Sequence, residues 1–149
     1  MEIRFAKASD IDRFMDLVRL VKDDFPGLET EESLKEHRDT VLRFIENRSA
    51  ICALEDGGTA GVLLFSAEDG ELCFLAVHPL FRRRRIAEKM FSLMISQMDV
   101  DKDIKVTTFR EGDPKGISAR AFYKKLGFSE GELFVEFGYP AQKLILKRK

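Results

Sequence analysis

Apolar and polar residues follow strand and helix periodicities along nearly the whole chain. Residues 2–6 alternate between polar and apolar side chains, which predicts a strand. Apolar side chains then recur at helical spacing over 11–25, and a Pro-Gly pair stops this predicted helix. Thr30 is placed to cap a second helix, which we expect to end near Arg48.

Three short apolar segments follow, each bounded by residues that favour turns. The predicted strands cover 50–54, 60–65 and 71–77, with Asp-Gly turns between them. Strands joined by such short turns pair with their neighbours in opposite directions. This region is therefore predicted to be an antiparallel meander.

The second half of the chain alternates helices with strands. A broad apolar face predicts a helix over 82–98, and a strand is predicted over 104–109. A short helix over 117–126 should end at the glycine that follows it, in a left-handed cap. Two final segments, 133–137 and 143–146, flank a Gly-Tyr-Pro turn and predict a closing hairpin. The order β-α-α-β-β-β-α-β-α-β-β predicts an α+β domain with three layers around one mixed sheet.

Composition indicates one domain in a reducing environment. Residues 1–149 hold 44% apolar side chains and no linker or repeat, so a single domain with its own core is expected. The net charge of −1 argues against a general nucleic-acid binder. Cys52 and Cys73 fit neither a zinc spacing nor a disulfide framework, and we expect no metal. Neither a signal peptide nor a long apolar span is visible, so we expect a cytoplasmic protein that is not bound to a membrane.

The most informative stretch is a run of four arginines, Arg82 to Arg85, at the predicted start of a helix. The helix dipole already makes that end positive, so each arginine is unfavourable there by about 0.3–1 kcal/mol. A bound phosphate or pyrophosphate would compensate, because free backbone N–H groups and guanidinium groups both favour an anion. The run alone also fits a solvated basic face, or a nucleic-acid or nuclear-localisation patch.

Two segments resemble the signatures of the GNAT superfamily of N-acetyltransferases. The first segment covers residues 75–87 and reads Leu-Ala-Val-His-Pro-Leu-Phe-Arg-Arg-Arg-Arg-Ile-Ala. It is similar to the family's first signature, in which a strand is followed by Val-x-Pro, an aromatic residue and then Arg/Gln-x-x-Gly-x-Gly/Ala at the start of a helix. Residues 119–128, Ala-Arg-Ala-Phe-Tyr-Lys-Lys-Leu-Gly-Phe, resemble its Ala-x-x-Phe/Leu-Tyr-x-Lys-x-Gly-Phe. The succession of elements is similar over nearly the whole chain. The resemblance implies a GNAT-like acyl-CoA N-acyltransferase fold with a central mixed, mostly antiparallel sheet.

The sequence departs from the family's signatures at two positions. Arg85 stands where the family has its central glycine. We expect a helical Arg85 whose side chain turns away and leaves the backbone donors free, because a left-handed conformation there would be strained. Gly116 stands where many relatives have Asn, so one contact to the cofactor's pantetheine arm is expected to be lost or moved to Ser118.

The resemblance further implies how the chain would bind acetyl-CoA. Main-chain groups of a strand would pair with the amide arm, backbone amides at the helix start would hold the pyrophosphate, and arginine side chains would reach the 3′-phosphate. The implied cofactor-binding residues are Leu75, Ala76, Val77, Arg82, Arg83, Arg84, Arg85, Ile86, Ala87, Ser118 and Tyr123.

For catalysis the resemblance implies Tyr123 as the general acid near the cofactor sulfur and Glu71 as the base. A phenol with a pKa of about 10 can protonate a leaving thiolate and still be neutral at pH 7. The attacking amine must be uncharged, and Glu71 would deprotonate it directly or through a water. The alternatives are a core aromatic for Tyr123 and a solvent-facing residue for Glu71. His37 and His78 are expected at a helix surface and in a loop, without a nucleophilic or metal-binding role.

Together these features favour an acetyl-CoA-dependent N-acetyltransferase that works by direct attack in a ternary complex. We expect both cysteines in core strands, which argues against a thiol relay. The acceptor would be a primary amine of a small molecule or protein, and the chain could form a homodimer. Acids near the implied acceptor mouth favour a cationic amine. These acids are Asp23, Asp24, Glu29, Glu31, Glu32, Glu130, Glu132 and Glu136.

Two other functions stay open at this point. The first is a non-catalytic module that binds acyl-CoA as a sensor or scaffold, for which neither Tyr123 nor Glu71 would be needed. The second is nucleic-acid binding through the arginine run, which we do not expect because the run lacks interleaved aromatic residues.

Overall fold

The computed structural model of the chain describes residues 1–82 and 84–148. Its strands are β1 (Glu2–Phe5), β2 (Ala50–Glu55), β3 (Gly58–Ser66), β4 (Glu71–Val77), β5 (Ile104–Phe109), β6 (Ser129–Glu136) and β7 (Tyr139–Leu146). Its α-helices are α1 (Ile11–Val21), α2 (Glu31–Glu46), α3 (Ile86–Ile95) and α4 (Ile117–Leu126). The predicted order of elements is confirmed. Within the described ranges, no helix combines the length and the apolar character that crossing a membrane requires.

The strands form one sheet in the order β1-β2-β3-β4-β5-β7-β6. Neighbouring strands run in opposite directions except β4 and β5, which are parallel. A parallel pair needs a crossover connection, and α3 provides it between the end of β4 and the start of β5. The predicted mixed, mostly antiparallel sheet is therefore confirmed, and β7 lies between β5 and β6.

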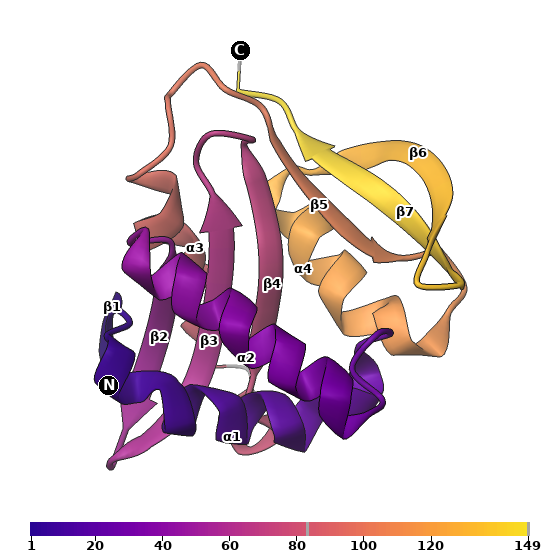
Figure 1. The fold of residues 1–149 in the computed structure, drawn as a ribbon. Helices are drawn as coiled ribbons and strands as arrows, with labels where there is room; N and C mark the ends of the chain where they lie inside the picture. The colour runs from indigo at the N-terminus through magenta and orange to yellow at the C-terminus, as the bar shows by residue number, and fades with distance from the viewer. Residues whose placement is uncertain (83, 149) are drawn as a thin grey trace.

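Helices cover both faces of this sheet, as Figure 1 shows. On one face α1 and α2 pack on the first half of the sheet, through a core that includes Phe14, Leu34 and Val62. On the other face α3 and α4 cover a second core, which includes Met90 and Tyr123. The predicted three-layer α/β/α arrangement is therefore confirmed.

The two cores do not extend equally far across the sheet. Among the described residues, the core under α1 and α2 contains side chains of β2, β3 and β4 but none of β5, β6 or β7. In Figure 1 both helices lie over the first strands, and β5, β7 and β6 are not covered from that side. One face of the second half of the sheet is therefore open, and the border of the open half runs along β4 and β5.

The predicted bounds agree best where strong breakers flank an element. β4, β5 and α4 begin and end at the predicted residues. Gly127, directly after α4, has a φ of 103°, which is the left-handed cap predicted for it. The closing hairpin turns at Phe137 and Gly138 rather than at Gly138-Tyr139-Pro140, because Phe137 and Gly138 both take the positive φ of a two-residue turn.

The start of α3 is the main departure from the prediction. α3 begins at Ile86, not near Arg82, and it ends at Ile95 rather than Met98. The chain first makes a single 3-10 turn, Pro79–Phe81, and Arg82 is then extended, with φ −66° and ψ 155°. Several arginines in a first helical turn would repel one another and the helix dipole, so the helix forms only after the charged run.

A buried ion-pair network fixes β1 to α1. The Asp10 side chain is 2% exposed and accepts hydrogen bonds from Arg4 Nη1 at 2.7 Å, Arg13 Nη2 at 2.6 Å and the backbone N–H of Lys7 at 2.7 Å. The hydrogen bond from Arg4 is the main reason that the pKa of Asp10 falls from its ordinary 3.8 to about 2. A carboxyl whose pKa is lower in the folded than in the unfolded chain stabilises the fold when it is ionised.

Replacing Asp10 with Asn should therefore lower the free energy of unfolding by about 2 kcal/mol at neutral pH. The contribution of the ionised carboxylate is complete above the unfolded-state pKa of 3.8 and is lost as the pH falls through about 2. The stabilities of parent and variant, measured by urea unfolding at several pH values, should therefore converge in acid. Asp12→Asn serves as the control, because the Asp12 side chain is 92% exposed. A difference that does not change with pH would contradict this account.

Candidate functional site

β4 and β5 separate soon after they begin. The parallel pairing includes only the first two residues of β4, Glu71 and Leu72. The register between β3 and β4 shifts directly afterwards, which leaves Cys73 as an extra, bulged residue. A bulge bends its strand and increases the twist. β4 therefore turns away from β5, and a V-shaped gap between the strands opens toward Val77 and Phe109.

Along this gap, no described strand pairs with the main-chain groups of β4 after the bulge. The N–H of His78 donates to the carbonyl oxygen of Ala60 at 2.8 Å, so the main-chain groups of His78 point toward β3. Because successive residues of a strand alternate, the N–H and C=O groups of Leu75 and Val77 point the other way, into the gap. Ala76 faces β3. Of the three residues predicted to bind the amide arm, Leu75 and Val77 thus present free main-chain groups to an extended ligand.

The arginine run lies beyond the open end of β4 and leads into α3. Arg85 precedes the helix with φ 61° and ψ 21°, a left-handed conformation, so the prediction of a helical Arg85 is wrong. This conformation costs a non-glycine residue about 1–3 kcal/mol, and it is the one to which the family's glycine is suited. Ile86 and Ala87 then begin the helix. Arg83 lies outside the described residues.

The described side chains of the arginine run remain in solvent. Arg82, Arg84 and Arg85 are exposed, and the ion pair from Arg85 to Glu88 is long, at 4.0 Å. No described residue accepts a hydrogen bond from the backbone N–H groups of the first two residues of α3. Free N–H groups at a helix start, with guanidinium groups beside them, are suited to binding a phosphate.

α4 begins on the other side of the gap, against the end of β5. A Cβ atom on Gly116, the residue before α4, would lie only 2.7 Å from the Cβ of Phe109. The close packing of the helix start on β5 therefore explains why no side chain is present at this position. Ser118, which is predicted to take over the missing contact, is exposed in the first turn of α4.

Tyr123 extends from α4 into the core on the α3–α4 face of the sheet. Its side chain is 5% exposed, and its ring centroid lies 5.5 Å from those of Phe122 and Phe128. Burial raises the pKa of the Tyr123 phenol well above its ordinary value of 10. The phenol therefore keeps its proton near neutral pH, which a proton donor requires.

Two carboxylates near the open face of the sheet influence each other electrostatically. Glu71 is half-buried at the point where β4 and β5 separate. Glu136 is the last residue of β6, and its pKa is raised by partial burial and by the negative charge of Glu71. The sequence predicts Glu136 only as one acid among several at the acceptor mouth, because no local pattern reveals the strand register that brings it near Glu71.

Comparison with known proteins shows the family of this chain. A family model described as "Acetyltransferase (GNAT) domain" matches residues 46–130, which is more than half of the chain. The chain belongs to the GNAT acetyltransferase family. No protein of curated function matches it in sequence.

Solved structures share the GNAT fold at low sequence identity. A GNAT-family acetyltransferase from Bacillus cereus ATCC 10987 is similar with a TM-score of 0.75 and 18% identity, over 99% of this chain and 97% of that chain. An aminoglycoside 6′-N-acetyltransferase complexed with coenzyme A has a TM-score of 0.72 and 15% identity, over 100% and 98%. A Salmonella typhimurium protein solved with its cofactor acetyl-CoA has a TM-score of 0.73 and 15% identity, over 99% and 94%. The predicted GNAT fold is confirmed.

Two residues of this GNAT domain lie in other surroundings than the sequence predicts. The sequence predicts Cys73 in the core, but the bulge exposes the residue. The pKa of its thiol is nevertheless raised to about 12, first because the surroundings of the sulfur exclude water and then by the charge of Glu71, so it is a weak nucleophile. The sequence predicts His37 at a helix surface, but its ring packs on Phe74 at 4.9 Å. Within the described residues His37 Nε2 is buried without a hydrogen-bond partner.

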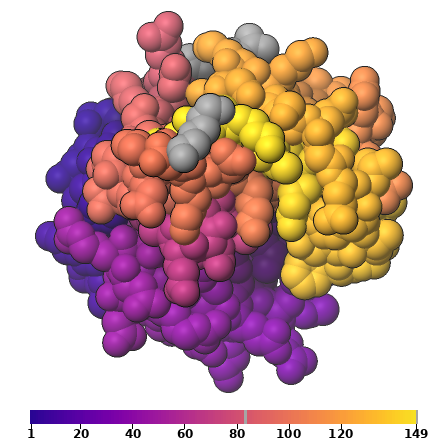
Figure 2. Space-filling view, turned by 90° about the horizontal axis from the view of Figure 1, so that it is seen from above, coloured from indigo at the N-terminus to yellow at the C-terminus, as the bar shows by residue number. Residues whose placement is uncertain are grey.

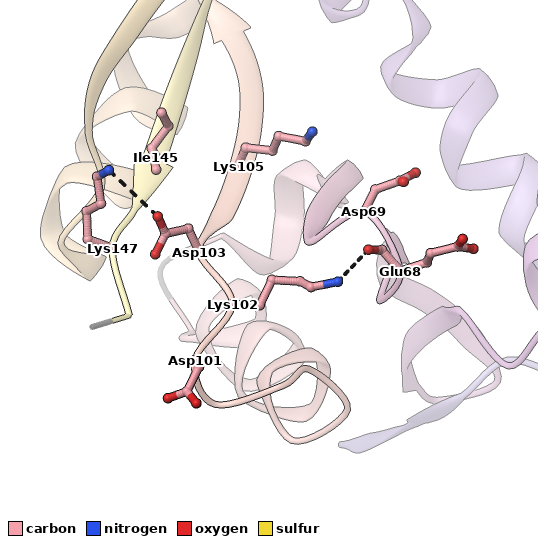
Figure 3. Close-up of a pocket in the computed structure, with 8 residues that line it drawn as sticks. All are labelled: Glu68, Asp69, Asp101, Lys102, Asp103, Lys105, Ile145 and Lys147. Carbon is pink, nitrogen blue, oxygen red and sulfur yellow. Dashed lines mark hydrogen bonds and ion pairs between the residues drawn. The ribbon is translucent and has the colours of Figure 1, made fainter.

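A hollow of about 730 Å³ lies away from the gap, where the β3–β4 turn meets the segment before β5 and the end of β7 (Figure 3). Acidic and basic side chains line it together and pair within the protein. The Lys102 ammonium donates to the main-chain oxygen of Glu68, and Lys147 Nζ lies 3.7 Å from Asp103 Oδ2. Charged residues make up nearly all of its lining, whereas small-molecule sites are lined mainly by hydrophobic and aromatic side chains. Among the described residues, no group of side chains is arranged to hold a metal ion.

Proposed function

We propose that this GNAT domain is an acetyl-CoA-dependent N-acetyltransferase that transfers the acetyl group to a primary amine of a small molecule or a protein. The observation that carries the proposal is the gap between β4 and β5. Along one edge of this gap, the main-chain groups of Leu75 and Val77 have no partner among the described strands. Structures with the same fold that contain coenzyme A or acetyl-CoA support the same ligand here.

The shape and charge of the gap match the parts of acetyl-CoA. The pantetheine arm carries two amides, which would pair with Leu75 and Val77 in the manner of an added strand. The pyrophosphate would then lie at the free N–H groups of α3. The exposed guanidinium groups of Arg82 and Arg84 would contact the remaining phosphate, since arginine binds phosphate through paired hydrogen bonds.

The transfer would proceed by direct attack of the amine on the thioester. Glu71 takes one proton from the acceptor's ammonium group, directly or through a water, and the neutral nitrogen attacks the carbonyl carbon. The C–S bond then breaks, and the leaving sulfur takes the proton of the Tyr123 phenol. The second proton of the amine nitrogen returns to the phenolate through solvent. The products are the amide and coenzyme A, and Glu71 finally releases the proton that it took from the ammonium group to solvent.

The open face of the sheet supports entry of a cationic acceptor on the side opposite Tyr123. Glu71 and Glu136 are near enough to repel each other, and a positively charged amine between them would relieve that repulsion. The donor and the acceptor would thus approach the same point from opposite faces of the sheet, which direct transfer requires.

Replacing Arg82 and Arg84 together with Gln should weaken acetyl-CoA binding by about tenfold or more for each arginine, because a hydrogen bond to a charged group contributes about 1.5–3 kcal/mol. The residual binding should depend less on salt. Calorimetric titration measures the affinity. The control is the pair Arg38→Gln and Arg43→Gln, which removes the same charge from exposed positions of α2. Unchanged acetyl-CoA affinity in the Arg82/Arg84 variant would show that these arginines form only a solvated basic face.

Tyr123→Phe should lower kcat by about 10²–10⁴-fold, the usual contribution of a general acid. kcat/KM should fall in parallel, because the lost interaction belongs to the transition state. Acetyl-CoA affinity should hardly change, since the ring still packs against Phe122 and Phe128. Thiol release in the presence of a panel of amines measures turnover, and Tyr139→Phe, which removes the other phenol of the chain, is the matched control.

Two results would contradict the role of Tyr123. Normal turnover of the Phe variant would show that water or another group protonates the sulfur. Intact acetyl-CoA binding without transfer to any amine, in parent and variant alike, would instead favour a non-catalytic acyl-CoA sensor.

A further inference from the structure

Phe137, at the tip of the β6–β7 hairpin, breaks two local rules at once. It is 75% exposed although it is a large aromatic residue. Its φ of 54° and the φ of 74° at Gly138 form a tight two-residue turn between Glu136 and Tyr139. The first position of such a turn favours Asn, Asp or Gly, whereas a bulky residue with positive φ is strained. The turn alone therefore does not explain a phenylalanine here.

The ring of Phe137 lies against the loop between α1 and α2. A Cβ atom on Gly27 would be 3.0 Å from Phe137 Cδ2, so the ring rests on bare backbone. Hydrogen bonds hold the neighbouring segments in place: Lys115 Nζ donates to the main-chain oxygen of Asp23 at 3.1 Å, and the Tyr139 hydroxyl donates to Asp113 at 2.7 Å. Phe137 thus bridges two segments that are far apart in the sequence.

These two segments border the open face of the sheet. In the view from above, a recess separates the purple atoms of the α1–α2 region from the yellow atoms of the hairpin (Figure 2). On the α1–α2 side, Phe25 stacks on Phe74 of β4 with ring centroids at 4.6 Å. On the hairpin side, Glu136 directly precedes Phe137 and interacts with Glu71. Aromatic rings and negative charge therefore both occur on the segments that border the open face.

We propose that Phe137 determines acceptor specificity: its ring covers an apolar or aromatic part of the acceptor while the cationic amine reaches the carboxylates of Glu71 and Glu136. The proposal rests on the proposed N-acetyltransferase function. An arylalkylamine has both features, since its ammonium group complements the acids and its ring can stack on Phe137 in an offset or edge-on arrangement. A small polar amine such as ethanolamine satisfies the charge but offers no surface to the ring.

The test compares acetyl transfer to 2-phenylethylamine and to ethanolamine, in the parent and in Phe137→Asn. Asn is suited to the left-handed turn position, so this variant should melt at the same or a higher temperature than the parent. The parent should prefer 2-phenylethylamine in kcat/KM by at least about tenfold, the size of effect that one well-placed apolar contact gives. The variant should lose most of this preference through a higher KM for 2-phenylethylamine, while kcat/KM for ethanolamine stays the same. Val135→Asn is the matched control, because Val135 is 63% exposed two residues earlier in β6 and alternates to the opposite face from Glu136.

The outcomes separate this proposal from the proposed function. A parent that prefers 2-phenylethylamine and a Phe137→Asn variant that alone loses the preference would support the role of Phe137. Equal transfer to both amines, transfer to ethanolamine alone, transfer to neither, or the same loss in Val135→Asn would overturn it. In each of these cases acetyl-CoA binding and transfer to other amines still decide independently whether the domain is an N-acetyltransferase.

Discussion

The structure depends on the early separation of two parallel strands. β4 and β5 pair over only two residues of β4 before the bulge at Cys73 bends β4 away. Main-chain N–H and C=O groups that lose their partners inside a protein must find others, in water or in a ligand. The separation therefore gives the middle of the sheet an edge at which main-chain groups can accept a ligand. It also places the start of α3 at the end of β4 and the start of α4 against the end of β5. The positions of the two helices that would hold the ends of acetyl-CoA therefore both depend on the separation of these strands.

Two of the four described non-glycine residues with positive φ lie at the inferred site, whereas the other two, Arg48 and Asp56, lie in turns outside it. Arg85 and Phe137 both have positive φ without being glycine, and both have exposed side chains. The left-handed conformation of Arg85 forms the turn into α3 and so sets the direction of the first N–H groups of the helix. The positive φ of Phe137 forms the hairpin turn in which its ring contacts Gly27. Strained residues that are not needed for packing are expected where a protein binds or reacts.

The fold could be predicted from the sequence because its elements have strong periodicity and clear breakers. Gly70 and Pro79 bracket β4, and Gly127 ends α4, so both elements have the predicted bounds. The start of α3 could not be placed in this way, because residues 82–85 are all arginine and include no capping or breaking residue, while electrostatic repulsion opposes a helix there. The influence of Glu71 on Glu136 and the contact of Phe137 with Gly27 depend on strand register and loop packing, which no local pattern encodes. The bulge at Cys73 also depends on strand register and could not be predicted, and it explains why this residue of an apolar run is exposed.

The central claim is that the gap between β4 and β5 binds acetyl-CoA, and calorimetric titration with acetyl-CoA and with its analogue lacking the 3′-phosphate tests it most directly. The account predicts one binding site per chain and a higher melting temperature with ligand, because a ligand that binds only the folded state stabilises it. It also predicts that the analogue binds about tenfold more weakly or worse, since contacts to the arginines are lost. No heat of binding and an unchanged melting temperature at millimolar acetyl-CoA would contradict it.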